Sequence, residues 1–409
     1  MQKQIALYVH IPFCMKKCNY CDFLSFSSDV DTKKKYLDTL YQEAVFWQKY
    51  LAGRYRIKTI FIGGGTPTCL SVSALEYLGD IIKLFDVNKD AEFTIEANPG
   101  TLDCDKVSII KKMGVNRVSF GLQSTVDEEL KVLGRIHTYD KFLESYYMLR
   151  DAGFDNINID LMSDIPKQSF ESYKKTLERV VSLSPEHISS YSLIIEPGTV
   201  FYKMYEEGKL DIADEDTDRQ MYSYTKDYLE KNGYHRYEIS NYSKSGRECK
   251  HNLVYWNLED YIGIGLGASS YFEGARFSDF SDMKKYRDTM YSCGSSYVSG
   301  GENAKKHVKE LTDSYDIGFK IRKRTENYEK LTEKAKMEEF MFVGLRKCIG
   351  VSKKEFENRF SHSIDEIYGN VIDKFIKNNL LSENDNSDRI YLTDKGIDVS
   401  NYILSEFLL

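Results

Sequence analysis

The chain has 409 residues, of which 42% are hydrophobic and 13% aromatic, so it can bury sizeable cores and is not a disordered chain. Its length predicts two to three domains. A formal net charge of -7 argues against a general nucleic-acid binder, and no apolar run approaches the roughly 20 residues of a membrane span. The eight cysteines do not indicate a disulfide framework in so long a chain. We expect a cytoplasmic protein in which clustered thiols hold metal or act in catalysis.

Short β-rich runs alternate with helical patterns from residue 4 to about 195. The predicted strands are 5–11, 59–64, 92–97, 117–122, 156–162 and 188–195, and the predicted helices lie near 33–51, 73–85, 103–113, 139–152 and 169–182. Six strands with helical crossovers predict a parallel α/β fold. No GxGxxG follows the first strand, which favours a partial (β/α)6 barrel of TIM type over a Rossmann fold. In such barrels the chemistry gathers at the C-terminal ends of the strands.

Three cysteines follow the first predicted strand within eight positions, at Cys14, Cys18 and Cys21. A structural zinc site needs four ligands, but the next cysteine, Cys69, is 48 residues away and the nearest histidine, His10, lies in the strand. A cubane iron–sulfur cluster also needs four ligands, one for each iron. Three thiolates leave one iron open to a substrate or cofactor. We therefore favour a working 4Fe–4S cluster, with zinc completed by a distant ligand as the alternative.

The ends of the other predicted strands also carry polar or glycine-rich features. They are GGGTP at 63–67, Glu96 in EANP, Gln123 in GLQS, Asp160, and Glu196 in EPGT. One glycine-rich turn alone is weak evidence. Because glycine has no Cβ, however, the GGGTP backbone could approach a ligand closely. Polar features at every strand end together predict a binding site at that end of the barrel.

The spacing CxxxCxxC after a strand resembles the cluster loop of the radical S-adenosylmethionine (radical SAM) enzymes, in which the open iron chelates S-adenosylmethionine. A closer resemblance, to the oxygen-independent coproporphyrinogen III oxidase-like family, covers nearly the whole chain. It is carried by LYVHIPFCMKKCNYCDF, GGGTPT, IEANPGT, RVSFGLQS, LGRIHT, HISSYSLIIEPGTVF and HNLVYWNLEDYIGIGLGASSY.

Position by position, this resemblance implies that Cys14, Cys18 and Cys21 hold the cluster. It implies contacts to S-adenosylmethionine from Tyr8, Tyr20, Gly64, Gly65, Thr66, Glu96, Gln123, Arg135 and Asp160. The chemistry agrees, because an arginine can fork onto the cofactor carboxylate and Asp or Gln can bond ribose hydroxyls. The alternative for each residue is an ordinary surface or core hydrogen bond.

The family contains true oxidases and a group of heme chaperones, which bind heme and pass it to acceptor proteins. Three features favour a chaperone here: Asp22-Phe23 replaces the oxidase Gly-Cys, only four residues precede the first strand, and HNLVYW (251–256) resembles the chaperone motif HNxxYW. Membrane respiratory enzymes are candidate acceptors. The alternatives are an active oxidase or another radical SAM enzyme, and a zinc-stabilised adaptor. The three features predict no conversion of coproporphyrinogen III to protoporphyrinogen.

His251 is the candidate axial heme ligand, since a neutral imidazole ligates heme iron well. Tyr255 and Trp256 would offer flat apolar surface to the macrocycle. The alternatives are a structural hydrogen-bonding role for His251 in a loop, and axial ligation by Cys249. The chain also departs from the family pattern Tyr-Gly-(Leu/Ile)-Pro after Asp160, where it has SDIP (163–166). We expect an altered loop at the mouth of the barrel.

The domain organisation we predict is a radical SAM barrel core at 1–200, barrel completion and a connection at 201–330, and a winged-helix-like domain at 331–409. The last part has three helical patterns, a hairpin and a final helix. The hairpin turn carries Glu383, Asp385 and Asp388. Carboxylates repel phosphates, so we expect no nucleic-acid binding by this wing.

Overall fold

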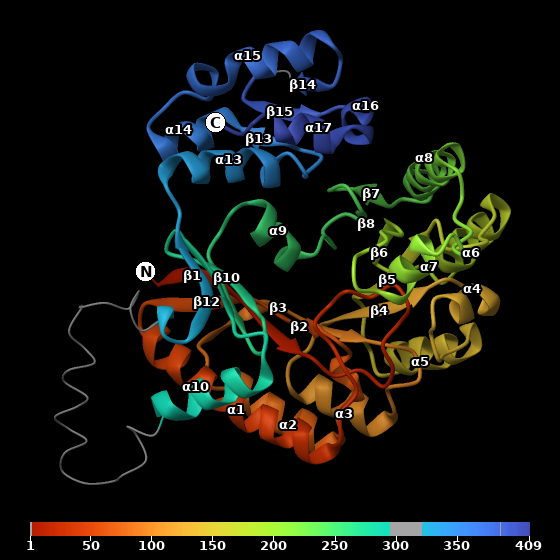
Figure 1. The fold of residues 1–409 in the computed structure, drawn as a ribbon, viewed down its shortest axis with the longest axis vertical. Helices are drawn as coiled ribbons and strands as arrows, with labels where there is room; N and C mark the ends of the chain where they lie inside the picture. The colour runs from red at the N-terminus through yellow and green to blue at the C-terminus, as the bar shows by residue number, and fades with distance from the viewer. Residues whose placement is uncertain (1, 295–320, 385) are drawn as a thin grey trace.

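The computed structural model describes residues 2–294, 321–384 and 386–409 (Figure 1). Its centre is a curved sheet with strand order β12-β11-β10-β9-β1-β2-β3-β4-β5-β6-β8-β7. The six consecutive central strands run parallel. They are β1 (Lys3–Ile11), β2 (Tyr55–Gly64), β3 (Val87–Ala97), β4 (Arg117–Gln123), β5 (Ile157–Ser163) and β6 (His187–Ser192). The predicted partial (β/α)6 barrel is therefore confirmed.

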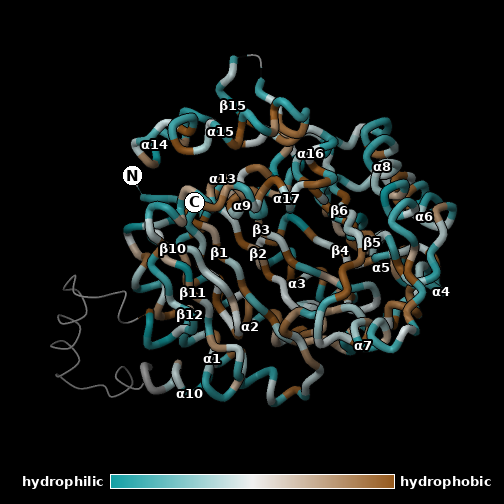
Figure 2. The backbone as a smooth tube through the Cα atoms, turned by 45° about the horizontal axis from the view of Figure 1, so that its top comes forward, coloured by the Kyte–Doolittle hydropathy of each residue, from teal (hydrophilic) through white to brown (hydrophobic). Residues whose placement is uncertain are grey.

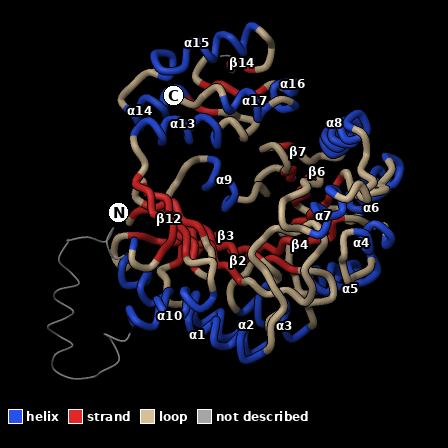
Figure 3. Tube along the Cα trace, viewed as in Figure 1, coloured by secondary structure: helices blue, strands red, loops and turns tan. Residues whose placement is uncertain are grey.

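Helices cover the outer face of these strands, as Figure 3 shows. They are α1 (Val30–Leu51), α2 (Val72–Ile82), α3 (Cys104–Lys112), α4 (Asp127–Val132), α5 (Tyr139–Asp151) and α6 (Phe170–Ser182). The five longer helices match the predicted ones, and each begins at an Asp, Ser or Thr whose side chain accepts a backbone N–H of the first turn. Helix α4 was not predicted, because six residues are too few to show a helical period.

Side chains alternate between the two faces of each strand. In β1 the fully buried Ile5, Leu7 and Val9 belong to the main apolar core, which also takes in residues of the covering helices. Tyr8 and His10, between them, face the interior of the barrel. Polar residues line the same inner face, where Asn158 bonds Ser119 and His187. The barrel interior is thus a polar network, while the apolar core lies between sheet and helices.

The segment after β6 extends both edges of the sheet. It contains α7 (Val200–Glu206), α8 (Glu215–Lys231), β7 (His235–Arg236), β8 (Asn241–Ser243), α9 (Lys250–Trp256), β9 (Tyr261–Ile264), β10 (Ser269–Phe272), β11 (Ala275–Asp279), α10 (Met283–Gly294) and β12 (Thr325–Lys330). Strand β8 joins β6, and β9 joins the opposite edge at β1. Many buried apolar residues of this segment belong to the main core. Helix α8 lies at the periphery and is mostly hydrophilic (Figure 2). The boundaries predicted at 200 and 330 stay a prediction.

The C-terminal part has its own apolar core. It comprises α13 (Glu333–Gly344), β13 (Val351–Ser352), α14 (Lys353–Phe360), α15 (Ile364–Lys377), β14 (Leu381–Glu383), β15 (Arg389–Leu392), α16 (Asp394–Asp398) and α17 (Ser400–Ser405). The predicted helices and hairpin are present, and β13 adds a third strand in the order β13-β15-β14. Glu383 pairs with Lys353 at 2.9 Å, whereas Asp385 lies outside the described residues. None of the helices described is both long and apolar enough to span a bilayer.

Candidate functional site

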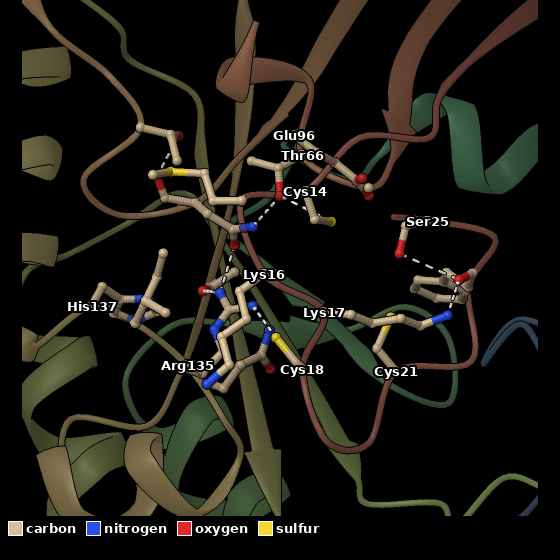
Figure 4. Close-up of a pocket in the computed structure, with 18 of the residues that line it drawn as sticks. Cys14, Lys16, Lys17, Cys18, Cys21, Ser25, Thr66, Glu96, Arg135 and His137 are labelled. Carbon is tan, nitrogen blue, oxygen red and sulfur yellow. Dashed lines mark hydrogen bonds between the residues drawn. The ribbon is translucent and has the colours of Figure 1, made fainter. Parts of the chain in front are cut away.

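A cavity opens at the C-terminal ends of the parallel strands, where the fold predicts the chemistry. Eleven of the residues predicted to bind the cluster or S-adenosylmethionine line it: Cys14, Cys18, Tyr20, Cys21, Gly64, Gly65, Thr66, Glu96, Gln123, Arg135 and Asp160. Glu196, at the end of the sixth predicted strand, does not. Figure 4 shows the cysteine loop along one wall, facing Thr66 and Arg135. Tyr8 and His251 do not line this cavity.

The cysteine loop is pinned at its base and near its middle. At the base, Phe13 pairs with Phe26, and the Cys14 amide donates to the Phe26 carbonyl at 3.0 Å. Near the middle, the Asn19 side chain donates to the Val132 carbonyl at 2.9 Å, which ties the loop to the end of α4. The loop therefore presents its three cysteines to the cavity.

The donor set suits a multi-iron cluster. All three cysteines are free and only partly buried, and burial raises the pKa of the Cys21 thiol. Within the described residues, no three His, Cys, Asp or Glu side chains converge on a position for one metal ion. A single ion would need its ligands about 2.0–2.3 Å away, whereas a cubane takes one thiolate on each of several irons. Three separate thiols in one loop are therefore compatible with a cubane that takes one thiolate on each of three irons.

Gly64 and Gly65 of GGGTP are required by the packing of the protein itself. Gly64 has φ +108°, and a Cβ there would lie 2.5 Å from the His10 ring. A Cβ on Gly65 would lie 2.6 Å from the carbonyl oxygen of Phe13. The loop thus packs closely against the end of β1 and the cysteine loop, and the Thr66 amide donates to the Phe13 carbonyl at 2.7 Å.

Two carboxyl groups enter the cavity without forming an ion pair with a described residue. Glu96 accepts from the Gly64 amide at 3.0 Å, and burial, with Asp160 adding, raises its pKa to about 8. Asp160 accepts from the Asn158 side chain at 2.7 Å, and burial raises its pKa too. Buried carboxyl groups of this kind are stabilised as carboxylates by a cationic or hydrogen-bond-donating ligand.

Gln123 reaches the cavity through an irregular strand end. It has φ +72°, and the pairing of β4 with β5 shifts register between Gly121 and Gln123. A bulge of this kind re-aims a side chain next to a site. Positive φ is uncommon for a residue other than glycine, so the sequence alone did not predict this geometry.

Among the described residues, Arg135 is the only arginine that lines the cavity. Its Nη2 donates to the side-chain oxygen of Asn98 at 2.5 Å and to the Gly121 carbonyl, and its Nη1 donates to Cys18 Sγ at 3.5 Å. Asn98 and the buried His137 also line the cavity, although neither was predicted. Both lie in motifs of the sequence, EANP and LGRIHT, in which only Glu96 and Arg135 were predicted to bind the cofactor.

Tyr8 lies inside the barrel. Its hydroxyl is 3.0 Å from His10 Nδ1. Tyr8 lines a second cavity together with Tyr255 and Trp256. Its predicted contact to S-adenosylmethionine stays a prediction.

His251 lies on helix α9, rather than in a loop, and only 1% of its surface is exposed. The Glu92 carboxylate caps the helix start, accepting the amides of Lys250 and His251 at 3.0 Å each. His251 Nδ1 is 2.9 Å from the Thr59 hydroxyl and Nε2 is 2.9 Å from the Tyr255 hydroxyl. With both ring nitrogens engaged, His251 cannot ligate heme iron in this conformation. Cys249 is fully buried against Glu92, which leaves it closed to heme as well.

The loop 163–166, which departs from the family pattern, is held in place by Asp164, one of the residues that differ from the pattern. Asp164 has φ +58°, a conformation that glycine adopts more readily, and its carboxylate accepts from the Ala213 amide at 3.1 Å. Burial, with Asp218 adding, raises the pKa of Asp164 to about 6. Ser163 is buried and lies 3.2 Å, oxygen to oxygen, from Ser192. The altered loop is therefore held against the segment before α8.

The fold and the cavity define a protein of the radical SAM class. The sequence profile of the Radical SAM superfamily matches residues 8–180, and that of the HemN C-terminal domain matches 331–399. Membership of this superfamily implies a 4Fe–4S cluster and S-adenosylmethionine. A solved structure titled coproporphyrinogen III oxidase (HemN) from Escherichia coli covers 100% of this chain and 90% of its own, with a TM-score of 0.80 at 22% identity. At that identity the likeness shows the fold.

Curated relatives define the family more closely. The chain is 36% identical to the heme chaperone HemW of Bacillus subtilis, covering 98% of this chain and 99% of that protein. It is 37% identical to the heme chaperone HemW of Lactococcus lactis, covering 100% and 98%. The chain therefore belongs to the HemW family of radical SAM proteins.

Proposed function

We propose that this protein is a heme chaperone that carries a 4Fe–4S cluster with S-adenosylmethionine and delivers heme to acceptor proteins. The observation that carries the proposal is the convergence of Cys14, Cys18 and Cys21 with the glycine-rich loop and the polar strand ends on one cavity. This convergence occurs in a chain related over its full length to curated heme chaperones.

In the proposed cofactor site the three cysteines hold the cluster and leave one iron open. When bound, the reduced cluster supplies the electron for cleaving S-adenosylmethionine in this superfamily. The Arg135 guanidinium receives the cofactor carboxylate, and Gln123 and Asp160 receive ribose hydroxyls. Glu96 lies beside the glycine-rich loop that we assign to the amino group. With a pKa of about 8, Glu96 is mostly protonated at neutral pH. A nearby ammonium group would lower this pKa and favour the ionised form.

Heme binding is the second part of the proposal. It is supported by the relatives' names, by Asp22-Phe23 in place of the oxidase Gly-Cys, and by the HNLVYW segment. His251 is the proposed axial ligand, which requires that Tyr255 or Thr59 release a ring nitrogen first. The cysteines whose side chains are described are all free, in keeping with a reducing, cytoplasmic setting.

An active radical SAM enzyme, such as a coproporphyrinogen III oxidase, is the second candidate. One observation favours it: the cofactor cavity retains its predicted polar residues. Anaerobic incubation of reconstituted protein with coproporphyrinogen III, S-adenosylmethionine and a reductant separates the two candidates. A chaperone binds heme stoichiometrically and yields no protoporphyrinogen, whereas an oxidase turns the substrate over.

A further inference from the structure

Asn98 joins two parts of the cofactor cavity that come from different strands. It follows β3, and its side-chain amide donates to the Thr66 hydroxyl at 2.6 Å. Its side-chain oxygen accepts from Arg135 Nη2 at 2.5 Å. We call Thr66, Asn98 and Arg135 the Asn98 bridge.

The two ends of the bridge reach the cluster cysteines. Thr66 Oγ1 lies 3.6 Å from Cys14 Sγ, and Arg135 Nη1 donates to Cys18 Sγ at 3.5 Å. Figure 4 shows Thr66 beside Cys14 and Arg135 beside Cys18, with dashed lines marking these contacts. A continuous chain of hydrogen bonds therefore runs from one cluster cysteine to another through Asn98.

The surrounding residues make room for this arrangement. A Cβ on Gly121 would lie 2.7 Å from Asn98 Oδ1 and 3.0 Å from Arg135 Nη2, so a larger residue there would displace both. The two N–H groups of Nη2 are taken by Asn98 and the Gly121 carbonyl. Within the described residues, the long contact to Cys18 is the one hydrogen bond of Nη1, and Nε is buried without a partner. The bridge thus fixes one side of the guanidinium and leaves the second N–H of Nη1 for a ligand.

We propose that Asn98 is a positioning residue for S-adenosylmethionine. It holds the guanidinium assigned to the cofactor carboxylate and the loop assigned to its amino group in one fixed relation, so both ends of the amino-acid moiety are received together. This role rests on the proposed cofactor site. A neutral amide suits the task, because it accepts from Arg135 and donates to Thr66 without neutralising the arginine. An aspartate would neutralise the guanidinium and repel the cofactor carboxylate.

The test compares S-adenosylmethionine with its decarboxylated analogue, which keeps the sulfonium and amino groups. Dissociation constants are measured anaerobically on cluster-reconstituted wild type, N98A and N98D with matched iron content. The matched control is N116A. Asn116 pins the start of β4 to β3 through Ala91 and Phe93, and it does not line the cavity. If the N98A substitution acted only by loosening β3, N116A should weaken S-adenosylmethionine binding as much as N98A does.

We expect N98A to weaken S-adenosylmethionine binding about tenfold, the scale of one hydrogen bond to a charged group, and to change binding of the analogue much less. N98D should weaken S-adenosylmethionine binding further but leave the doubly cationic analogue bound as tightly as in wild type, or more tightly. If N98A does not fold, the isosteric N98D variant still tests the proposal. It should lower the affinity for S-adenosylmethionine without lowering the affinity for the analogue.

Equal losses for both ligands, a change within twofold in both variants, or an equal loss in N116A would each overturn the role of Asn98. In those cases the proposed cofactor site would still be supported, provided that the wild type binds S-adenosylmethionine. Wild type that fails to bind S-adenosylmethionine would instead overturn the proposed cofactor site, and the role of Asn98 with it.

Discussion

The Nε2 atom of His251 lies 2.9 Å from the hydroxyl oxygen of Tyr255, one turn further along helix α9. The proposed heme ligand is thus closed off by a residue of its own HNLVYW motif. Tyr255 also lines the neighbouring aromatic cavity with Trp256 and Tyr261. If the Tyr255 side chain turned away, Nε2 would lose the partner that competes with heme iron.

The Y255F variant should therefore bind heme more tightly than wild type. Removing one neutral hydrogen bond, worth about 0.5–1.5 kcal/mol, corresponds to a gain of about two- to tenfold in affinity. H251A should shift the Soret band or lower heme affinity, since the axial ligand determines the iron spectrum. Heme titration followed by absorbance measures both. Unchanged spectra and affinity in both variants would remove His251 as the ligand while leaving heme binding itself intact.

Replacing Cys14, Cys18 or Cys21 with alanine should abolish the iron–sulfur cluster. Anaerobically purified wild type should contain about four irons per chain, the count of a cubane. The matched control is C104A, because Cys104 is an exposed free cysteine at the start of α3. Metal analysis and absorbance spectra check this, and zinc as the sole metal in wild type would contradict it.

Replacing Arg135 with alanine should weaken S-adenosylmethionine binding by about 1.5–3 kcal/mol, the range for a hydrogen bond to a charged group. The cluster should remain, because Arg135 is not one of its three proposed ligands, and its contact to Cys18 Sγ is a long hydrogen bond of 3.5 Å. R56A serves as the control, since the partner of Arg56 is the surface residue Asp86. Calorimetry with equal affinities for wild type and R135A would show that Arg135 is not the carboxylate receptor.

Stability should fall in mild acid because of His251. Burial, with Arg117 and Lys58 adding, lowers the pKa of this imidazole from 6.5 to about 3. Between those values the unfolded chain binds the proton and the folded chain does not, so the free energy of unfolding declines as pH falls from 6.5 towards 3. His251 contributes at most about 1.4 kcal/mol per pH unit.

Urea unfolding of the cluster-free protein at pH 4.5–6.5 tests the stability prediction. H251N should show a shallower decline than wild type, because it lacks the titrating group, and the two should run parallel above pH 7.5. Parallel curves across the acid range would mean that the pKa of His251 is the same in the folded and unfolded protein, which would contradict the prediction.

The barrel could be predicted because its signals are local and repeated. Strands such as 117–122 and helices such as 139–152 have a clear periodicity of apolar residues. Because parallel strands bring their C-terminal ends to one edge, Glu96 and Asp160 could be predicted to lie in one site. The HNLVYW helix was missed because seven residues show little period and its start is capped by Glu92, a residue distant in sequence. The Gln123 bulge and the Asn98 bridge depend on contacts between strands, which a single sequence does not display.

The most direct test of the chaperone proposal measures heme binding and coproporphyrinogen turnover on the same anaerobic, cluster-reconstituted preparation. Heme is titrated first, and coproporphyrinogen III is then incubated with S-adenosylmethionine and a reductant. The proposal predicts one heme bound per chain and no protoporphyrinogen above the background without protein. Turnover above that background, or failure to bind heme, would contradict it.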